Sequence, residues 1–285
     1  MSELRPDHQR RLERYFESAD RAQDWDAIYE ATSLDGLVHQ DRQALALEWI
    51  ESLALPAGAS ALDVGCGPGR TAVAMADRGL EVTALDSSAE MRALASTRAE
   101  KAGVGERVSV HSGDAKHLGF EPGSYDLVVA LGVLPYLASP ERALRELARV
   151  TRAGGYIVVS SDNRLRLNRL LDPRFSPMLA PLRNLVKAWR RRRGAPPLKR
   201  TVPAALAGAT KLLSLGEMEH MIGAAGMTTE RTAGIGFGLF TFMGRVVLPE
   251  RGAIRVHRSL MPLGARGVPG VQSVALQHLL LAHVS

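Results

Sequence analysis

A short glycine-rich segment constrains the fold of this chain more than any other stretch. The apolar run 61–64 ends in three glycines at alternate positions, Gly65, Gly67 and Gly69, and a helix-like run begins at Thr71. Glycine lets the backbone adopt positive φ and approach a ligand closely. A helix that follows directs free N–H groups toward the same place. The pattern predicts a buried strand, a ligand-binding turn and a helix in a doubly wound α/β sheet.

An acidic residue follows the next apolar run. Asp86 ends the run 81–85 and lies 21 positions after Gly65, close to the spacing at which a second strand presents a carboxylate to a ribose. Ser87 and Glu90 match an S-x-x-E capping box, which predicts a helix directly after the acid. Together these features predict a site for a nucleoside.

The glycine spacing distinguishes between nucleoside ligands. It is G-x-G-x-G, not the G-x-G-x-x-G of dinucleotide-binding proteins, and Asp63 stands two positions before the first glycine. A carboxylate there repels a pyrophosphate but attracts an ammonium or sulfonium group. Residues 63–69 resemble motif I of the class I S-adenosylmethionine-dependent methyltransferases, whose usual form is E/D-x-G-x-G-x-G.

Three further segments follow in the order of that family: Asp86 with its helix, residues 112–115, and the apolar stretch 124–136, which resembles motif IV. The resemblance implies that Asp86 holds the ribose hydroxyls, that Met91 packs near the adenine and that Asp114 accepts a hydrogen bond from the adenine amino group. The full set of cofactor-binding residues implied is Asp63, Gly65, Cys66, Gly67, Gly69, Asp86, Ser87, Met91, Asp114, Ala115 and Leu131.

The resemblance covers roughly residues 58–162 and implies seven strands, mostly parallel with an antiparallel last strand. The predicted organisation is an N-terminal helical lid (1–56), an S-adenosylmethionine-binding Rossmann-like core (57–162), a basic cap insertion after strand five (163–212) and completion of the core (213–285), with a second insertion at about 244–271. Trp25 and Tyr29 are candidate lid residues, and a plain packing role for them is an equal alternative.

Several element boundaries follow from local patterns. Helical spacing predicts a helix over 9–31 and another from about Gln40 to Leu53. A helix over 214–226, with Ser214 as N-cap, precedes a strand over 227–232. Residues 274–282 read as the last strand, with a helix as the alternative because Leu and Ala dominate. Residues 234–242 are aromatic and glycine-rich, which suggests an acceptor-pocket wall.

The net charge of +6 is concentrated in one segment. Residues 164–200 hold twelve Arg or Lys and one acid, Asp172, and include an apolar stripe (Leu182, Leu185, Val186, Trp189) that runs into Arg190–Arg193. Three interpretations remain open. The segment is a solvated helix packed on the core, a cap that recognises an anionic acceptor or carrier, or an attachment to RNA or a membrane surface.

The remaining composition favours a cytoplasmic protein. Cys66 is the single cysteine, so no internal disulfide can form and a reducing compartment fits. The first residues lack the apolar stretch of a signal peptide. No run approaches the ~20 apolar residues that span a bilayer.

Methyl transfer from a sulfonium is an in-line displacement that depends mainly on proximity and alignment. A hydroxyl or amine acceptor also needs a base. The candidate bases are Tyr136, Asp162, His117 and His220. Tyr136 can equally be a pocket wall, His117 a surface loop residue and His220 a packing or solvent-facing residue. No metal is predicted, because the sequence has no Cys/His cluster with ligand spacing.

The acceptor class rests on the turn after strand four. Its sequence is Leu134-Pro135-Tyr136, not the N-P-P-Y or D-P-P-Y of amino-methyltransferases acting on nucleobases or glutamine. The hypothesis is therefore an O-, N- or C-methyltransferase of a small molecule in secondary or quinone-type metabolism. The alternatives are a tRNA or rRNA methyltransferase that uses Arg190–Arg193, a non-catalytic S-adenosylmethionine-binding protein and, last, a dinucleotide-dependent oxidoreductase. The sequence disfavours nucleic acid as a partner, since no RNA-binding module is appended.

Overall fold

The computed structural model describes residues 19–171, 210–238, 240–242 and 245–285, together with residues 181, 184, 185, 188, 189, 192 and 193. Some predictions lie outside these residues: the helix start at 9–18, most of the insertion 163–212, and, within it, Leu182, Val186, Arg190 and Arg191.

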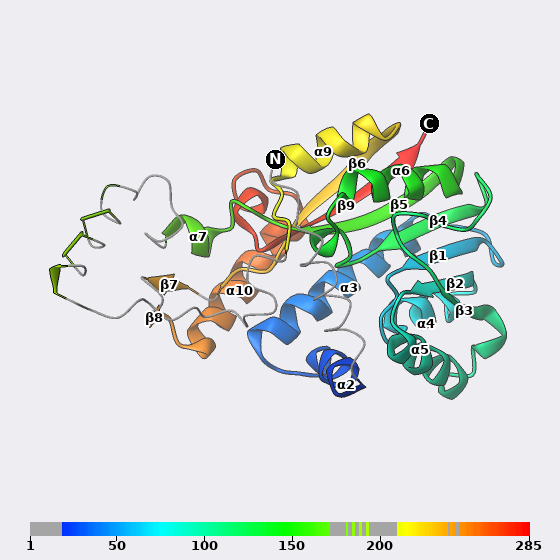
Figure 1. Cartoon of the computed structure of the whole chain (residues 1–285), viewed down its shortest axis with the longest axis horizontal. Coiled ribbons are helices and arrows are strands. Elements are labelled where there is room, and N and C mark those ends of the chain that lie inside the picture. Colours follow the sequence, from blue (N-terminus) through cyan, green and yellow to red (C-terminus); the bar gives the residue numbers. More distant parts are fainter. Residues whose placement is uncertain are drawn as a thin grey trace.

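A seven-stranded sheet forms the centre of the molecule, in the order β3-β2-β1-β4-β5-β9-β6 (Figure 1). Strands β1 to β5 pair in parallel, and β9 pairs antiparallel with both of its neighbours, so the predicted sheet is confirmed. The strands are β1 (Ser60–Val64), β2 (Glu81–Asp86), β3 (Val108–Ser112), β4 (Tyr125–Ala130), β5 (Thr151–Asp162), β6 (Met227–Ile235) and β9 (Gln277–Val284).

The apolar runs of the sequence become the central strands because both faces of the sheet are covered. Every residue of β4 is buried. Strand β9 is buried over Leu279–Ala282, which explains why a Leu- and Ala-rich segment is a strand and not the alternative helix. Strand β9 lies between β5 and β6 and forms backbone hydrogen bonds with both of these strands.

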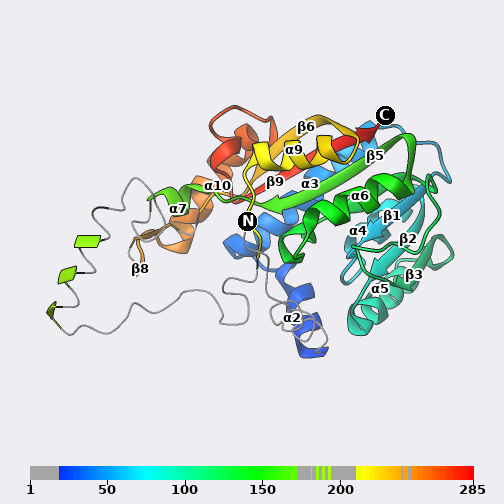
Figure 2. The same cartoon turned by 45° about the horizontal axis from the view of Figure 1, so that its top comes forward.

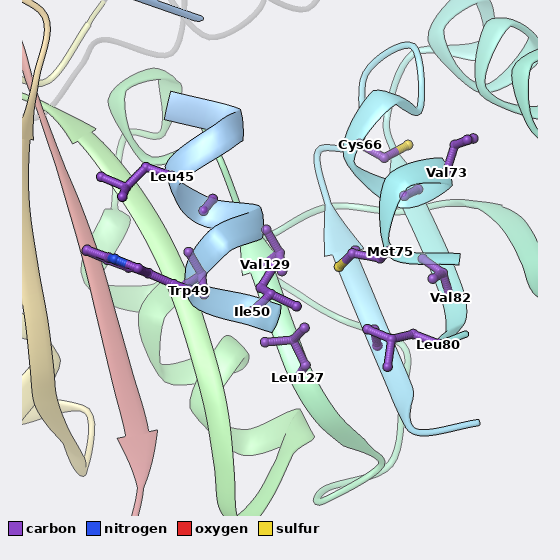
Figure 3. Packing of buried hydrophobic residues seen from close by; sticks show 14 of the residues in the cluster. Leu45, Trp49, Ile50, Cys66, Val73, Met75, Leu80, Val82, Leu127 and Val129 are labelled. Carbon is purple, nitrogen blue, oxygen red and sulfur yellow. The ribbon is translucent and has the colours of Figure 1, made fainter. Parts of the chain in front are cut away.

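Two helical layers cover the sheet (Figures 1 and 2). Helices α3, α4, α5 and α10 bury side chains in the core on one face, and α6 and α9 do so on the other. Figure 3 shows the first core, where Ile50 of α3 lies beside Leu127 and Val129 of β4, while Trp49 points from α3 in the opposite direction. The helices are α2 (Ala19–Ile28), α3 (Leu34–Ser52), α4 (Arg70–Ala76), α5 (Ala89–Lys101), α6 (Pro140–Val150), α7 (Leu167–Leu171), α9 (Leu215–Ala224) and α10 (Glu250–Ala265).

Short elements complete the described chain. They are the 3₁₀ turns η1 (Gly105–Arg107), η2 (Leu134–Tyr136) and η3 (Gln272–Val274), and a small ribbon of β7 (Thr241–Phe242) and β8 (Arg245–Val246). Helix α10 lies within residues 244–271, the segment predicted as a second insertion, and packs on α3 and β6.

Two helix starts differ from the prediction. Helix α3 begins at Leu34, because the Ser33 hydroxyl accepts the Gly36 N–H at 3.2 Å and caps the helix earlier than Gln40. The N-cap of α5 is Ser88, so the capping box predicted at Ser87 is wrong by one residue. The Asp86 carboxylate accepts the Ser88 N–H at 2.9 Å and thereby moves the helix start along by one position.

The predicted acceptor wall at 234–242 is wrong for Phe237. This ring is 1% exposed and lies in the core against α10, where it meets the backbone at Gly264. Its backbone N–H donates to Nδ1 of His257 at 3.3 Å, and Nε2 of His257 pairs with Asp41 at 2.7 Å. These contacts fasten α10 to α3.

The predicted N-cap of α9 is confirmed and provides a stability test. The Ser214 hydroxyl accepts the Glu217 N–H, and the Glu217 carboxylate accepts the Ser214 N–H at 2.7 Å. We expect Ser214→Ala to lower the free energy of unfolding by about 1 kcal/mol, because an orphan N–H loses its acceptor. Chemical denaturation measures this, with Thr97→Ala on the exposed face of α5 as the control. An equal effect of both substitutions would contradict the assignment.

Candidate functional site

One pocket, with a volume of about 330 Å³, lies at the carboxyl ends of β1, β2 and β4. This is the edge at which doubly wound sheets bind ligands. All the predicted cofactor-binding residues line it except Gly69, and both candidate lid residues, Trp25 and Tyr29, line it as well. The lining also includes residues that the sequence analysis did not single out: Arg42, Val64, Pro68, Thr71, Leu85, Ser88, Gly113, Gly132, Val133 and Leu137.

The glycines of the loop have different roles. Gly65 has φ +68°, and a Cβ there would collide with the side chain of Val133. Gly69 caps α4 with φ +79°, and its Cβ would lie 2.8 Å from Cα of Ala95, so this glycine permits contact between α4 and α5. A Cβ added at Gly67 would meet no neighbour, but this glycine has φ +52° and lines the pocket, so a side chain there would be strained and would occupy space open to a ligand.

Asp86 organises the loop from the next strand. One carboxylate oxygen accepts the Gly67 N–H and the other accepts the Ser88 N–H, each at 2.9 Å. Burial raises the pKa of Asp86, while these backbone donors and Arg92 oppose that rise. The carboxylate therefore links the glycine loop to the start of α5 and remains at the pocket surface.

Asp63 is a buried acid of the site, and one of its carboxylate oxygens lacks a hydrogen-bond partner on any residue that the structure describes. It is 2% exposed, and burial together with the charge of Asp86 raises its pKa to about 7, although the Ala72 N–H donates to it. Its Oδ2 has no hydrogen-bond partner among the described residues. An orphan carboxylate oxygen at a pocket wall favours a cationic group in the pocket, because burial of an unpaired acceptor is costly.

Arg42 of α3 lines the pocket and is 2% exposed. Its Nη2 donates to the Tyr29 hydroxyl at 3.1 Å and its Nη1 to Oε1 of Gln277 at 3.3 Å, while its Nε has no partner among the described residues. The Gln277 amide in turn donates to Asp162 at 3.0 Å. A buried guanidinium with a spare donor suits an anionic ligand group.

A sequence signal for Arg42 did exist. Helix α3 buries the apolar residues Leu34, Val38, Leu45 and Trp49, and Arg42 falls between Val38 and Leu45 so that the five recur at intervals of three and four. An arginine is rarely fully buried unless it is paired, so a cation on an apolar helix face is a candidate for a site.

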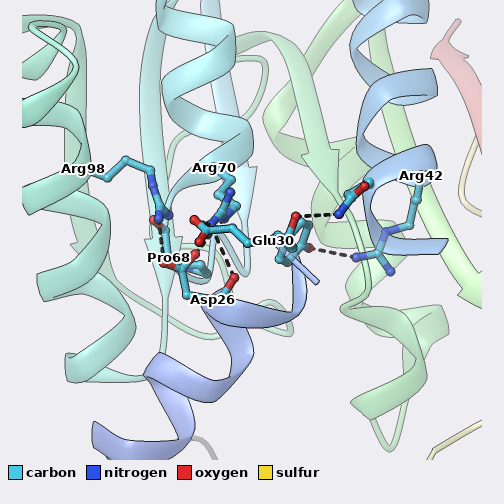
Figure 4. Close-up of polar contacts among 8 residues, drawn as sticks. Asp26, Glu30, Arg42, Pro68, Arg70 and Arg98 are labelled. Carbon is cyan, nitrogen blue, oxygen red and sulfur yellow. Dashed lines mark hydrogen bonds and ion pairs between the residues drawn. The ribbon is translucent and has the colours of Figure 1, made fainter. Parts of the chain in front are cut away.

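Helix α2, which carries the candidate lid residue Trp25 and ends just before the other candidate, Tyr29, is joined to the glycine loop by an ionic cluster (Figure 4). The Asp26 carboxylate of α2 accepts from Nε of Arg70 and from Nη2 of Arg98, each at 2.7 Å, and Glu30 accepts from Arg70 at 2.7 Å. Arg98 also donates to the Pro68 carbonyl at 2.6 Å. Burial acts to raise the pKa of Asp26, but the two arginines hold it below its ordinary value. The cluster lies beside Trp25 and Tyr29 in the sequence, and both of these residues line the pocket.

The four candidate bases are placed differently. Tyr136, on η2, lines the pocket. His117 and His220 are exposed and do not line it. Asp162 ends β5 and does not line the pocket, but Gln277 links it to the pocket residue Arg42, and burial raises the pKa of Asp162. The structure thus brings one of the four candidates into the pocket.

Within the described part of the chain, His, Cys, Asp and Glu side chains form no group that could hold a metal ion. No helix in that part has the length and apolar content that a membrane crossing requires.

Comparisons with known proteins agree with this geometry. Residues 62–159 match the family described as methyltransferase domain. The chain is similar to a ubiquinone biosynthesis O-methyltransferase of Burkholderia vietnamiensis, with 33% identity over 124 residues, which are 44% of this chain and 53% of the relative. The chain therefore spans about half the length of the curated relatives it matches.

Solved structures share the fold. Magnesium protoporphyrin IX methyltransferase of Synechocystis with bound S-adenosylhomocysteine aligns with a TM-score of 0.61 and 17% identity, over 96% of this chain and 98% of that one. The [4+2]-cyclase SpnF aligns with a TM-score of 0.52 and 18% identity, over 84% and 79%. The family match shows that residues 62–159 carry a methyltransferase domain, and the solved structures show that the chain has the Rossmann-like fold of class I S-adenosylmethionine-dependent methyltransferases.

Proposed function

We propose that the protein transfers the methyl group of S-adenosylmethionine to an O, N or C atom of a small molecule, in secondary or quinone-type metabolism. This proposal rests on two buried groups of opposite charge that line the same pocket, each with one atom that has no hydrogen-bond partner among the described residues. They are the Asp63 carboxylate and the Arg42 guanidinium. A zwitterionic amino-acid group would satisfy both.

The residues present fit the cofactor. Asp63 would accept from its ammonium group, Arg42 would donate to its carboxylate, and Asp86 would accept from its ribose hydroxyls. Met91 and Asp114, which line the pocket near the start of α5 and after β3, would hold the adenine. When bound, the cofactor supplies a methyl group that its sulfonium has already activated.

The protein is proposed to align the acceptor with the methyl group and to exclude water from the pocket. Trp25 and Tyr29 cover the pocket and exclude water, and the Asp26 cluster holds them there. Tyr136 is our base for an acceptor hydroxyl or amine, because it is the candidate that lines the pocket. Asp162 is assigned a positioning role instead, through Gln277 to Arg42.

The acceptor is proposed to be a quinone-type phenol or a related small molecule. The curated relatives named for ubiquinone biosynthesis support this class. An anionic or carrier-bound acceptor fits the same proposal, because residues 164–200 carry an excess of positive charge in the sequence. We also propose a cytoplasmic location, which the lone Cys66 supports, and the division into lid (1–56), core (57–162 and 213–285) and insertions (163–212 and about 244–271).

The test is a labelling experiment. The purified protein is incubated with methyl-labelled S-adenosylmethionine and fractionated host extract, and the label is separated into acid-soluble and precipitated pools. We expect acid-soluble label that is lost with Asp86→Ala. Label in RNA would replace the proposal by RNA methylation, and no transfer despite tight cofactor binding would indicate a non-catalytic protein.

Arg42 gives a direct test of the pocket. We expect Arg42→Met to weaken S-adenosylmethionine binding by about 10- to 100-fold, since a charge-assisted hydrogen bond contributes about 1.5–3 kcal/mol. Isothermal titration calorimetry measures the change. The matched control is Arg145→Met on the exposed face of α6, which should bind normally. Unchanged affinity in both variants would remove Arg42 from the site.

A further inference from the structure

Large apolar side chains are exposed at one end of the molecule. Leu165 and Leu171, beside and within α7, are 43% and 53% exposed, and Val246 and Val247, at β8, are 54% and 58% exposed. Helix α7 packs beside β7, so these side chains belong to one neighbourhood, and Figures 1 and 2 both show α7 and β8 at the end of the molecule away from β1 to β3. The exposure of so many apolar groups in one region marks an interaction surface.

The segment that follows α7 adds an aromatic and more cations. Leu185 is 69% exposed and Trp189 is 52% exposed. The guanidinium of Arg193 lies 4.3 Å from the centroid of the Trp189 ring, a cation–π contact. Arg192 is exposed beside it. We name Leu185, Trp189, Arg192 and Arg193, which recur at the spacing of one helix face, the Arg–Trp surface.

The charge of this region narrows the kind of partner. Residues 164–200 carry a local charge of +11, whereas the rest of the chain carries −5. The partner is therefore anionic, and two copies of this surface would repel one another.

The apolar side chains distinguish among anionic partners. Aliphatic Leu and Val gain little from a sugar-phosphate backbone, but they gain about 25 cal/mol per Å² when they enter the acyl region of a bilayer. Tryptophan prefers the boundary between headgroups and acyl chains, and arginine binds lipid phosphate. We propose that the Arg–Trp surface docks the protein on an anionic lipid bilayer, as a peripheral and reversible attachment.

The position of this surface relative to the pocket is consistent with that role. Helix α7 follows β5 at its carboxyl end, the same edge of the sheet at which the pocket lies. The end of the molecule that would meet lipid thus lies on the pocket side of the sheet. This inference goes beyond the proposed methyl transfer and does not depend on it.

Vesicle flotation tests the docking with the full-length protein. Vesicles of phosphatidylcholine alone are compared with vesicles containing about 30 mol% phosphatidylglycerol. We expect binding to the anionic vesicles only, weakened in about 0.5 M salt by screening. Arg192→Glu/Arg193→Glu should reduce binding at least about tenfold, because each basic residue near the surface contributes about 1 kcal/mol. Trp189→Ser should also reduce it.

The matched control is Arg142→Glu/Arg145→Glu on α6, which makes the same charge change on exposed residues elsewhere and should bind as the native protein does. Cofactor binding by calorimetry, expected to be unchanged in all these variants, shows that each is folded. The proposal is overturned if the native protein ignores anionic vesicles, if both double variants lose binding equally, or if RNA displaces the protein from vesicles at equal phosphate concentration.

Discussion

Replacement of Asp86 with alanine is expected to lower the affinity for S-adenosylmethionine by at least about 100-fold. The carboxylate is the proposed acceptor for the ribose hydroxyls, and two charge-assisted hydrogen bonds contribute about 3 kcal/mol or more. The same substitution removes the acceptor for the Gly67 and Ser88 N–H groups, so the loop loses the geometry that faces the ligand. Isothermal titration calorimetry gives the dissociation constant directly.

Two control variants separate the loss of the ribose contacts from the loss of the loop contacts. Asp86→Asn keeps an oxygen for one backbone donor, and we expect a smaller loss than with alanine. Asp77→Ala removes an exposed acid beyond α4 and should leave binding unchanged. A dissociation constant for Asp86→Ala within threefold of the native value would show that the nucleoside lies elsewhere.

Replacement of Asp63 with asparagine is expected to stabilise the ligand-free protein at alkaline pH while it weakens cofactor binding. The folded protein keeps the Asp63 proton up to a pKa of about 7, whereas an unfolded chain loses it near the ordinary value of 3.8. The free energy of unfolding therefore falls as pH rises from about 4 to about 7 and stays low above that window. The asparagine amide does not titrate in this range, so the free energy of unfolding of the variant should not show this decrease.

Denaturation at several pH values measures the effect. We expect the advantage of Asp63→Asn to grow by about 2–3 kcal/mol between about pH 5 and pH 8. Asp77→Asn, an exposed acid, should show no such trend. A variant less stable than the native protein at pH 8 would contradict the raised pKa. Titration of the same samples should show weaker binding, because a neutral amide cannot pair with an ammonium group.

The sequence sufficed for the parts of the molecule whose signal is local. Apolar runs located the strands of the sheet, and the loop 63–69 with Asp86 located the pocket, because a strand, a turn and a helix are contiguous there. The N-cap Ser214 was likewise found from its neighbours three positions away. Ser88, by contrast, was missed by one residue, since Ser87 satisfies the same pattern.

Side chains that meet across the fold left little local signal. Arg42 contacts Gln277, 235 positions away, and Asp26 contacts Arg98, 72 positions away. His117 follows a predicted site residue closely, yet its side chain is exposed. Nearness to a motif places a backbone at the site, but the direction of the side chain depends on packing that only the folded chain supplies.

The position of β9 has a consequence for biosynthesis. The sheet places residues 277–284 between β5 and β6, so the strand that occupies this interior slot is synthesised after all its neighbours. Until those residues leave the ribosome, the edge of β5 has no partner and its apolar faces are incompletely covered. During synthesis the β5 edge therefore stays open and prone to aggregation, and the sheet is completed only once residues 277–284 have been made.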